Sequence, residues 1–94
     1  MPVGILTITL YLPECRSLKQ KRSLIKPSIS RLHREFNVSV AEISHHDNWK
    51  SAVLALAMVS PDSGYAQSAL QSVMRFFEHT WPDLPVSEFH IEVI

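Results

Sequence analysis

Hydrophobic and polar residues alternate in the first part of the chain. The even positions from Leu6 to Leu12 are all aliphatic, whereas the odd positions from Ile5 to Tyr11 include two threonines. This period of two predicts a β-strand. Residues 49–59 are mostly apolar at both even and odd positions, which favours a strand at the centre of a sheet. Strands are predicted at residues 3–12, 38–43, 49–59 and 86–94.

A helical period separates the first two predicted strands. Ser17 and Gln20 form a capping-box pattern, so Ser17 is expected to cap a helix that runs to about Phe36. Pro27 lies inside this helix and predicts a kink, because proline lacks the amide donor and clashes with the preceding turn. In the alternative, the helix begins at Pro27 and residues 14–25 form a loop. One kinked helix is favoured, because apolar residues on both sides of the proline share a stripe about 60° wide. The stripe consists of Leu18, Ile25, Ile29, Leu32 and Phe36.

A second helix is predicted from Tyr65 to about Thr80, where apolar residues again recur with a helical period. The order of elements is then βαββαβ. This order predicts an α+β fold, the ferredoxin-like sandwich, with two helices on one face of a four-stranded antiparallel sheet. The first and third strands are expected at the centre of the sheet. The whole chain, residues 1–94, is expected to form a single domain.

The alternation also assigns side chains to the two faces of the predicted sheet. The face under the helices is expected to carry Leu6, Ile8, Leu10, Phe89, Ile91 and Val93. The open face is expected to carry Ile5, Thr7, Thr9, Tyr11, Val38, Val40, Glu42, Val53, Ala55, Ala57, Glu88, His90 and Glu92. An apolar centre on an open sheet often marks a protein interface, in a homodimer or with another partner, and an ordinary solvent-exposed sheet is the alternative. The candidate interface residues are Ile5, Tyr11, Val53 and Ala55.

RNA-recognition domains of this topology stack bases on aromatic side chains of the two central strands. Here only Tyr11 and Trp49 could serve, and both lie near strand ends. The glutamates expected on this face would also repel phosphate. The sequence therefore disfavours RNA recognition on the open face of the sheet.

The composition is that of a small folded domain, with 46% hydrophobic residues and two glycines. The single cysteine, Cys15, excludes an internal disulfide and a multi-cysteine zinc site, and it fits a reducing cytoplasm. No apolar run approaches the roughly 20 residues of a membrane span. The alternating N-terminus lacks the basic region of a signal peptide. A cytoplasmic protein without membrane contact is expected.

Charge is segregated along a chain whose net charge is zero. Residues 1–34 contain seven Lys or Arg and one acid, a net charge of +6, and residues 35–94 contain two bases and eight acids, a net charge of −6. Such segregation on a small domain creates a local field that attracts an anionic partner. Because no catalytic motif occurs in the chain, the sequence favours a non-enzymatic binding module without a cofactor.

The basic residues concentrate on the first predicted helix. Lys19, Arg22, Lys26 and His33 share one flank beside the apolar stripe, and Lys21 borders the stripe on its other side. Free backbone amides at the helix N-terminus would add a seat for phosphate. Contact with RNA or with a ribosomal surface is the functional interpretation, and a solvated helix paired with acids is the alternative. The candidate nucleic-acid contacts are Arg16, Lys19, Lys21, Arg22, Lys26 and Arg34. Two bases are expected to contribute little, because they stand in the acidic part of the chain: Lys50 and Arg75.

Imidazole and carboxylate groups occur together at His45, His46 and Asp47. Such groups can bind a transition metal. Adjacent residues on an extended turn diverge, however, so a polar hairpin turn without a metal is expected here.

Two other patterns are weak signals of catalysis. Cys15 has no accompanying pattern of His and acid, so a partly exposed cysteine without a catalytic role is expected. Acylphosphatases share the predicted topology and cradle phosphate in a glycine-rich loop that carries an arginine. The corresponding loop here, residues 13–16, has no glycine, and Glu14 would oppose an anion. An enzyme of this kind is a remote alternative.

Four segments resemble those of a known family. They are Ser17–Arg22 (SLKQKR), Phe36–Glu42 (FNVSVAE), Asp47–Trp49 and Ala52–Leu54. With these segments the chain is similar to the bacterial YlxP-like family of small uncharacterised proteins. The resemblance extends over nearly the whole chain and implies a ferredoxin-like fold and a cytoplasmic protein with no assigned activity. Genes of the family often lie beside genes for translation initiation and ribosome maturation, which implies a ribosome-related partner.

Overall fold

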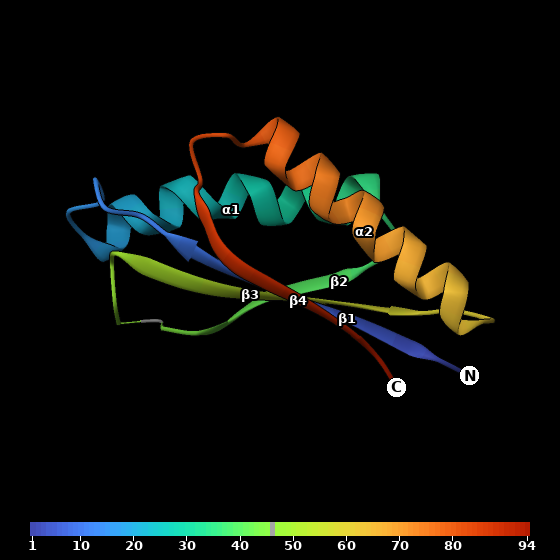
Figure 1. Ribbon diagram of the computed structural model, residues 1–94. Coiled ribbons are helices and arrows are strands. Elements are labelled where there is room, and N and C mark those ends of the chain that lie inside the picture. The colour runs from blue at the N-terminus through green and yellow to red at the C-terminus, as the bar shows by residue number, and fades with distance from the viewer. Residues whose placement is uncertain (46) are drawn as a thin grey trace.

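The computed structural model describes residues 1–45 and 47–94. It confirms the predicted order of strands and helices (Figure 1). The elements are β1 (Val3–Tyr11), α1 (Leu18–Glu35), β2 (Ser39–Ser44), β3 (Ser51–Val59), α2 (Ser63–Thr80) and β4 (Val86–Val93). The predicted third strand began at Trp49, whereas β3 begins at Ser51. Trp49 and Lys50 therefore belong to the connection that precedes β3.

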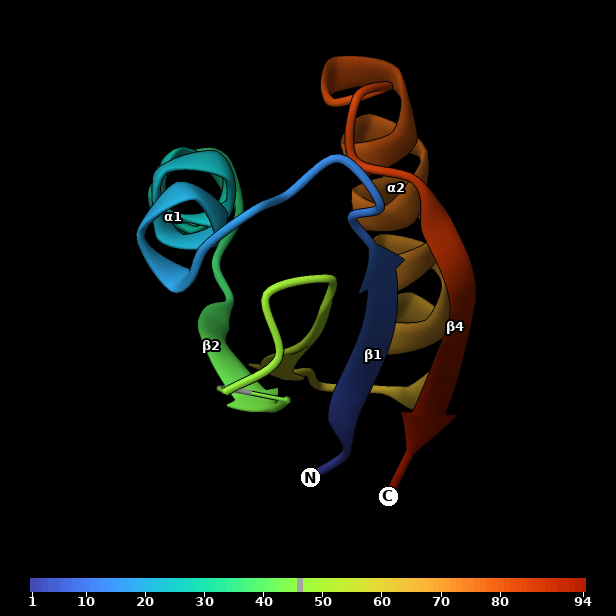
Figure 2. The ribbon, with the colours of Figure 1, turned by 90° about the vertical axis from the view of Figure 1, so that its left-hand side faces the viewer.

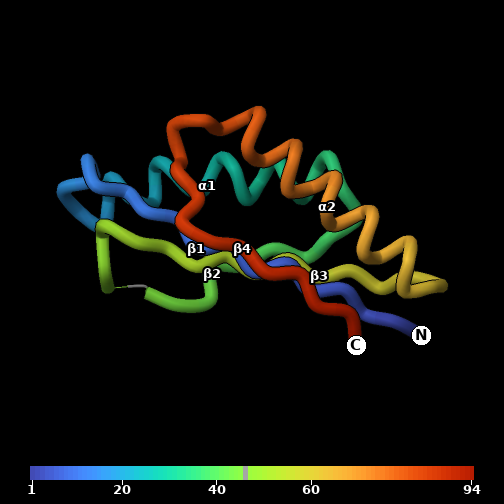
Figure 3. The backbone as a smooth tube through the Cα atoms, viewed as in Figure 1, coloured from blue at the N-terminus to red at the C-terminus, as the bar shows by residue number. Residues whose placement is uncertain are grey.

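The four strands form one antiparallel sheet in the order β2-β3-β1-β4, with β1 and β3 at the centre as predicted. Both helices cover the same face of the sheet, which confirms the ferredoxin-like fold (Figure 1). Helix α1 lies over β2, and α2 lies over β1 and β4 (Figure 2). The two termini lie side by side (Figure 3), where Val3 and Ile94 exchange both backbone hydrogen bonds.

The core lies between the helices and the sheet. Leu6, Ile8 and Leu10 of β1 are fully buried there, as their even spacing predicts. Phe89 on β4 pairs with Ile8 and so belongs to the same face of the sheet. Phe89 is nonetheless 50% exposed, because β4 is an edge strand and has a neighbour on one side only.

The predicted faces of the second strand are wrong. Val40 pairs with Leu56 and Glu42 with Leu54, so both lie on the face that the helices cover. Val38 and Val40 pack against the core. The strand alternates between exposed and partly buried positions, and its covered set includes the acid Glu42. The open face of β2 carries Ala41, which pairs with Ala55.

Helix α1 is one element that runs through Pro27, so the alternative that begins the helix at this proline is wrong. Ser17 caps the helix as predicted, because its hydroxyl accepts a hydrogen bond from the Gln20 amide at 3.1 Å. The side chain of Gln20 completes the box one residue earlier than the usual pattern: its carbonyl oxygen accepts from the amide of Arg16 at 2.7 Å. These two bonds fix the direction in which the chain enters the helix.

Candidate nucleic-acid interface

Three exposed bases form a row on one flank of α1: Lys19, Arg22 and Lys26. At 100° per residue they lie roughly 120–180° around the helix from Arg31. The Arg31 guanidinium lies 5.3 Å from the centre of the Phe76 ring on α2. The row therefore faces away from α2, on the outer side of the molecule above β2. We call Arg16, Lys19, Arg22 and Lys26 the α1 basic row, because exposed Arg16 directly precedes the cap of the same helix.

Arg34 is exposed but does not join the α1 basic row. It lies about 18 Å along the helix from Arg22, at a rise of 1.5 Å per residue, and about 120° around it. Arg31, between them in sequence, lies 3.8 Å from Glu35 in an exposed ion pair. Such pairs contribute little to stability. The bases in the C-terminal half of α1 thus present a separate surface.

Lys21 is wrongly predicted as a nucleic-acid contact. Its side chain is 1% exposed and points into the layer between α1 and the sheet. The ammonium lies 2.9 Å from a carboxylate oxygen of Glu42. It also donates hydrogen bonds to the backbone carbonyls of His45, Asn48 and Ser51, at 2.7, 2.8 and 3.0 Å. A buried charge needs such partners, and Lys21 uses its charge to hold the connection between β2 and β3 against α1.

Lys50 lies beside the basic end of the chain, although it belongs to the part of the sequence with a net negative charge. Its ammonium donates to the carbonyl oxygens of Pro13 and Cys15, at 2.8 and 3.2 Å. The backbone of Lys50 accepts a hydrogen bond from the Leu12 amide at 2.8 Å. The start of β3 is thus tied to the connection between β1 and α1. Lys50 adds a positive charge next to Arg16, against the expectation that it stands apart.

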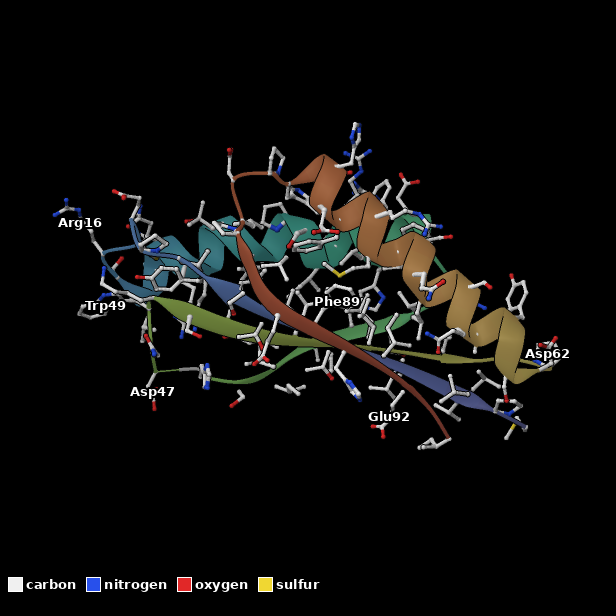
Figure 4. All side chains as sticks on the ribbon, viewed as in Figure 1. Arg16, Asp47, Trp49, Asp62, Phe89 and Glu92 are labelled. Carbon is white, nitrogen blue, oxygen red and sulfur yellow. The ribbon has the colours of Figure 1, made fainter. Side chains whose placement is uncertain are left out.

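A shallow pocket of about 400 Å³ lies where these two connections meet. We call it the Trp49 pocket. Its lining consists of Pro13, Glu14, Cys15, Arg16, Trp49 and Lys50. The Trp49 side chain is 45% exposed. Figure 4 shows Arg16 and Trp49 at the same end of the molecule, opposite Asp62.

Trp49 and Lys50 were not predicted to form one surface with Arg16. The signal was present in the predicted topology. Antiparallel central strands bring the end of the first strand next to the start of the third. Tyr11 accordingly pairs with Ser51, and the residues beyond this pair on either strand become neighbours.

The expected phosphate seat on free amides near Ser17 is only partly available. The amide of Cys15 donates to the Leu12 carbonyl at 3.1 Å. The amides of Arg16 and Gln20 are engaged by the capping bonds. Three of the backbone amides near the start of α1 are therefore already engaged within the protein.

Cys15 is buried, with 1% of its side chain exposed, so the expectation of a partly exposed cysteine is wrong. Its thiol donates to the Ser17 carbonyl at an Sγ–O distance of 3.4 Å and packs in the core. His45 of the predicted polar turn contacts the Ser51 hydroxyl through Nδ1 at 2.8 Å. His46 lies outside the described residues. Within residues 1–45 and 47–94, no three His, Cys, Asp or Glu side chains gather as metal ligands would.

The open face of the two central strands carries the predicted interface residues Ile5, Tyr11, Val53 and Ala55. Ala55 pairs with Thr7, while Val53 pairs with Thr9 on the adjacent strand. Tyr11 is 53% exposed, whereas Val53 is only 9% exposed. Glu88 and Glu92 of β4 border this face on the side away from β2. Figure 4 shows Glu92 on the side of the sheet opposite the helices.

These features define a small ferredoxin-like α+β domain with a basic flank on its first helix. The chain belongs to the family described as "Protein of unknown function (DUF503)", whose family model matches residues 3–91. It is also similar to the uncharacterized protein YlxP of Bacillus subtilis (strain 168), with 29% identity over 82 residues. That match covers 87% of this chain and 88% of the relative. The YlxP-like resemblance of the four sequence segments is thereby confirmed. Neither helix of the described chain has the length and apolar character needed to cross a membrane.

Proposed function

We propose that this protein is a cytoplasmic, non-enzymatic module that binds RNA, including RNA on a ribosomal surface, through the α1 basic row. The observation that carries the proposal is the exposed row itself, on a helix that has no acid before Glu35. Guanidinium and ammonium groups spaced along a helix flank contact successive phosphates of a nucleic-acid backbone. Lys50 extends the positive surface beyond the N-terminus of α1.

The distribution of charge across the sheet supports this orientation. Helix α1 lies over the β2 edge, and the acids Glu88 and Glu92 are on β4 at the opposite edge. These two acids of the C-terminal part therefore lie at the edge of the sheet away from α1. A domain with zero net charge but this dipole approaches an anionic surface with α1 foremost.

The proposal is tested by the affinity for a labelled single-stranded RNA as a function of salt. The change of Lys19, Arg22 and Lys26 together to Gln is expected to reduce both the affinity and its salt dependence. Binding then neutralises fewer phosphates and so releases fewer counterions from the RNA. The control changes three bases outside the α1 basic row to Gln, namely Arg31, Arg34 and Arg75, so both variants lose the same charge. Equal effects of the two variants, or no binding by the unchanged protein at low salt, would refute the proposal.

A second candidate function is self-association through the open sheet face. It is favoured by the partly exposed apolar residues Ile5 and Ala55 on the two central strands. They lie on the face of the sheet away from both helices (Figure 2). Exposed apolar faces of this kind mark protein interfaces. The proposed partner is a second copy of the chain, and the homodimer would leave the α1 basic row free on the other side of the sheet.

A further inference from the structure

We infer that the Trp49 pocket binds an unpaired nucleobase of the RNA whose phosphates contact the α1 basic row. This inference rests on the proposed function. It adds that the protein contacts a base of the RNA as well as its phosphates. The pocket, at about 400 Å³, lies within the size range of small-molecule sites. It is continuous with the α1 basic row, because Arg16 belongs to both.

Trp49 supplies the surface on which a base would stack. Its indole ring is 45% exposed in the pocket lining. Stacking on aromatic side chains is the main way in which proteins hold unpaired bases, and it tolerates any base because every base has a π-face. The other tryptophan, Trp81, packs against Phe77 at a centroid distance of 5.1 Å and is partly buried against the core. Trp49 is the more exposed of the two tryptophans, and it is the one that adjoins Arg16.

Glu14 determines which part of a nucleotide enters the pocket. Glu14 is one of the lining residues, and a carboxylate at this rim repels phosphate. The amides of Cys15 and Arg16, which could cradle phosphate, are already engaged in hydrogen bonds. A carboxylate can instead accept a hydrogen bond from the amino group of a base. The base thus lies inside, and the phosphates lie outside on Arg16 and the rest of the α1 basic row.

The pocket is held in place before any ligand binds. On one side, Lys21 fixes the carbonyls of Asn48 and Ser51, which flank Trp49 in sequence. On the other side, Lys50 ties the Trp49 connection to the carbonyls of Pro13 and Cys15. The side chain of Asn48 accepts from the Lys50 amide at 2.9 Å across Trp49. Such preorganisation lowers the entropic cost of binding.

The test compares a labelled single-stranded RNA with the duplex of the same sequence. Trp49→Ala is expected to weaken binding of the single strand by about 5- to 150-fold, the range of one lost base stack, and to leave duplex binding unchanged. Trp49→Phe should retain most of the affinity. The control is Tyr65→Ala, which removes another exposed aromatic ring, 59% exposed, on the first turn of α2 at the far end of the molecule. Circular dichroism of each variant checks the fold.

The salt dependence separates failure of this inference from failure of the proposed function. Trp49→Ala should keep the slope of log affinity against log salt, because no phosphate contact is lost, whereas the α1 triple change to Gln should reduce it. If the triple change acts as expected but Trp49→Ala binds the single strand as well as the unchanged protein, the base site is refuted and the RNA function stands. If Trp49→Ala weakens single strand and duplex equally, stacking on an unpaired base is also refuted. A protein that binds neither RNA at low salt refutes the proposed function.

Discussion

The ammonium group of Lys21 lies 2.9 Å from a carboxylate oxygen of Glu42, in the layer between α1 and the sheet. The side chains are 1% and 16% exposed, so this pair is largely removed from water. Three backbone carbonyls surround the same ammonium. An ammonium has three donors, and here all of them are used within the protein. Lys21 thus joins α1, β2 and the connection that carries Trp49.

The replacement Lys21→Met is expected to lower the free energy of unfolding by about 3–5 kcal/mol, because it removes a cation that contacts the largely buried Glu42 carboxylate and leaves three backbone carbonyls without their donor. Urea denaturation measures this loss. The matched control is Lys19→Met, at an exposed position two residues earlier, which should change stability by no more than about 0.5 kcal/mol. Similar stability of the two variants would contradict the structural role of Lys21.

Gly4 lies beneath α2 at a point of close approach. A Cβ atom added at this residue would come within 2.8 Å of the Leu70 side chain and 3.3 Å of the Ala66 methyl group. Gly4→Ala is therefore expected to destabilise the protein by roughly 1–3 kcal/mol through overpacking. Thermal denaturation checks it, with Gly64→Ala in the first turn of α2 as the control. If Gly4→Ala is as stable as the unchanged protein, α2 packs less closely on β1 than the structure indicates.

The fold was predictable because hydrophobic burial dominates its energetics and leaves a clear period. In β1, every helix-facing position from Leu6 to Leu10 is aliphatic. The sequence alone therefore predicts both the strand and the side of it that is buried. Strand β2 was harder, because an edge strand with the pattern SVAEIS places an acid in phase with its valines. A pattern treats Glu42 as a solvent-facing residue. Its covered position depends on Lys21, which is distant in sequence, and so only the three-dimensional structure assigns the strand its faces.

The candidate site was predictable only in part. The exposed bases Lys19, Arg22 and Lys26 follow from helical phase, which sequence reading handles well. Lys21 borders the apolar stripe of the same helix. Its angular position around the helix did not distinguish an exposed base at the edge of the stripe from a buried one. Lys50 was expected to contribute little because residues 35–94 are acidic as a whole, whereas its location depends on the pairing of β1 with β3. The charge of a sequence segment does not predict which residues lie beside it when strand pairing brings distant segments together.

Ile5→Glu is expected to dissociate a homodimer built on the open sheet face, because it adds a second carboxylate next to Glu92 on a face that the partner copy would bury. The side chain is only partly buried, so the monomer should keep its fold. Sedimentation measures the molecular mass, and Gln71→Glu on the exposed surface of α2 adds the same charge as a control. A monomeric unchanged protein at high concentration, or a dimer that tolerates Ile5→Glu, would remove this second candidate function.

The location of Lys50 predicts that it contributes to RNA binding, whereas the sequence alone predicted that it contributes little. Four phosphate contacts from the α1 basic row imply a slope of about −2 to −3 in log affinity against log salt for a single-stranded RNA, at roughly 0.7 per contact. Lys50→Gln should weaken binding and make the slope less steep by about 0.7, because its ammonium lies beside Arg16 at the Trp49 pocket. Arg75→Gln removes the same charge from α2, where the Arg75 guanidinium bonds to Ser72, and should leave both quantities unchanged. Equal binding by the two variants would mean that Lys50 serves only to hold the backbone of Pro13 and Cys15, and that the RNA contacts end at Arg16.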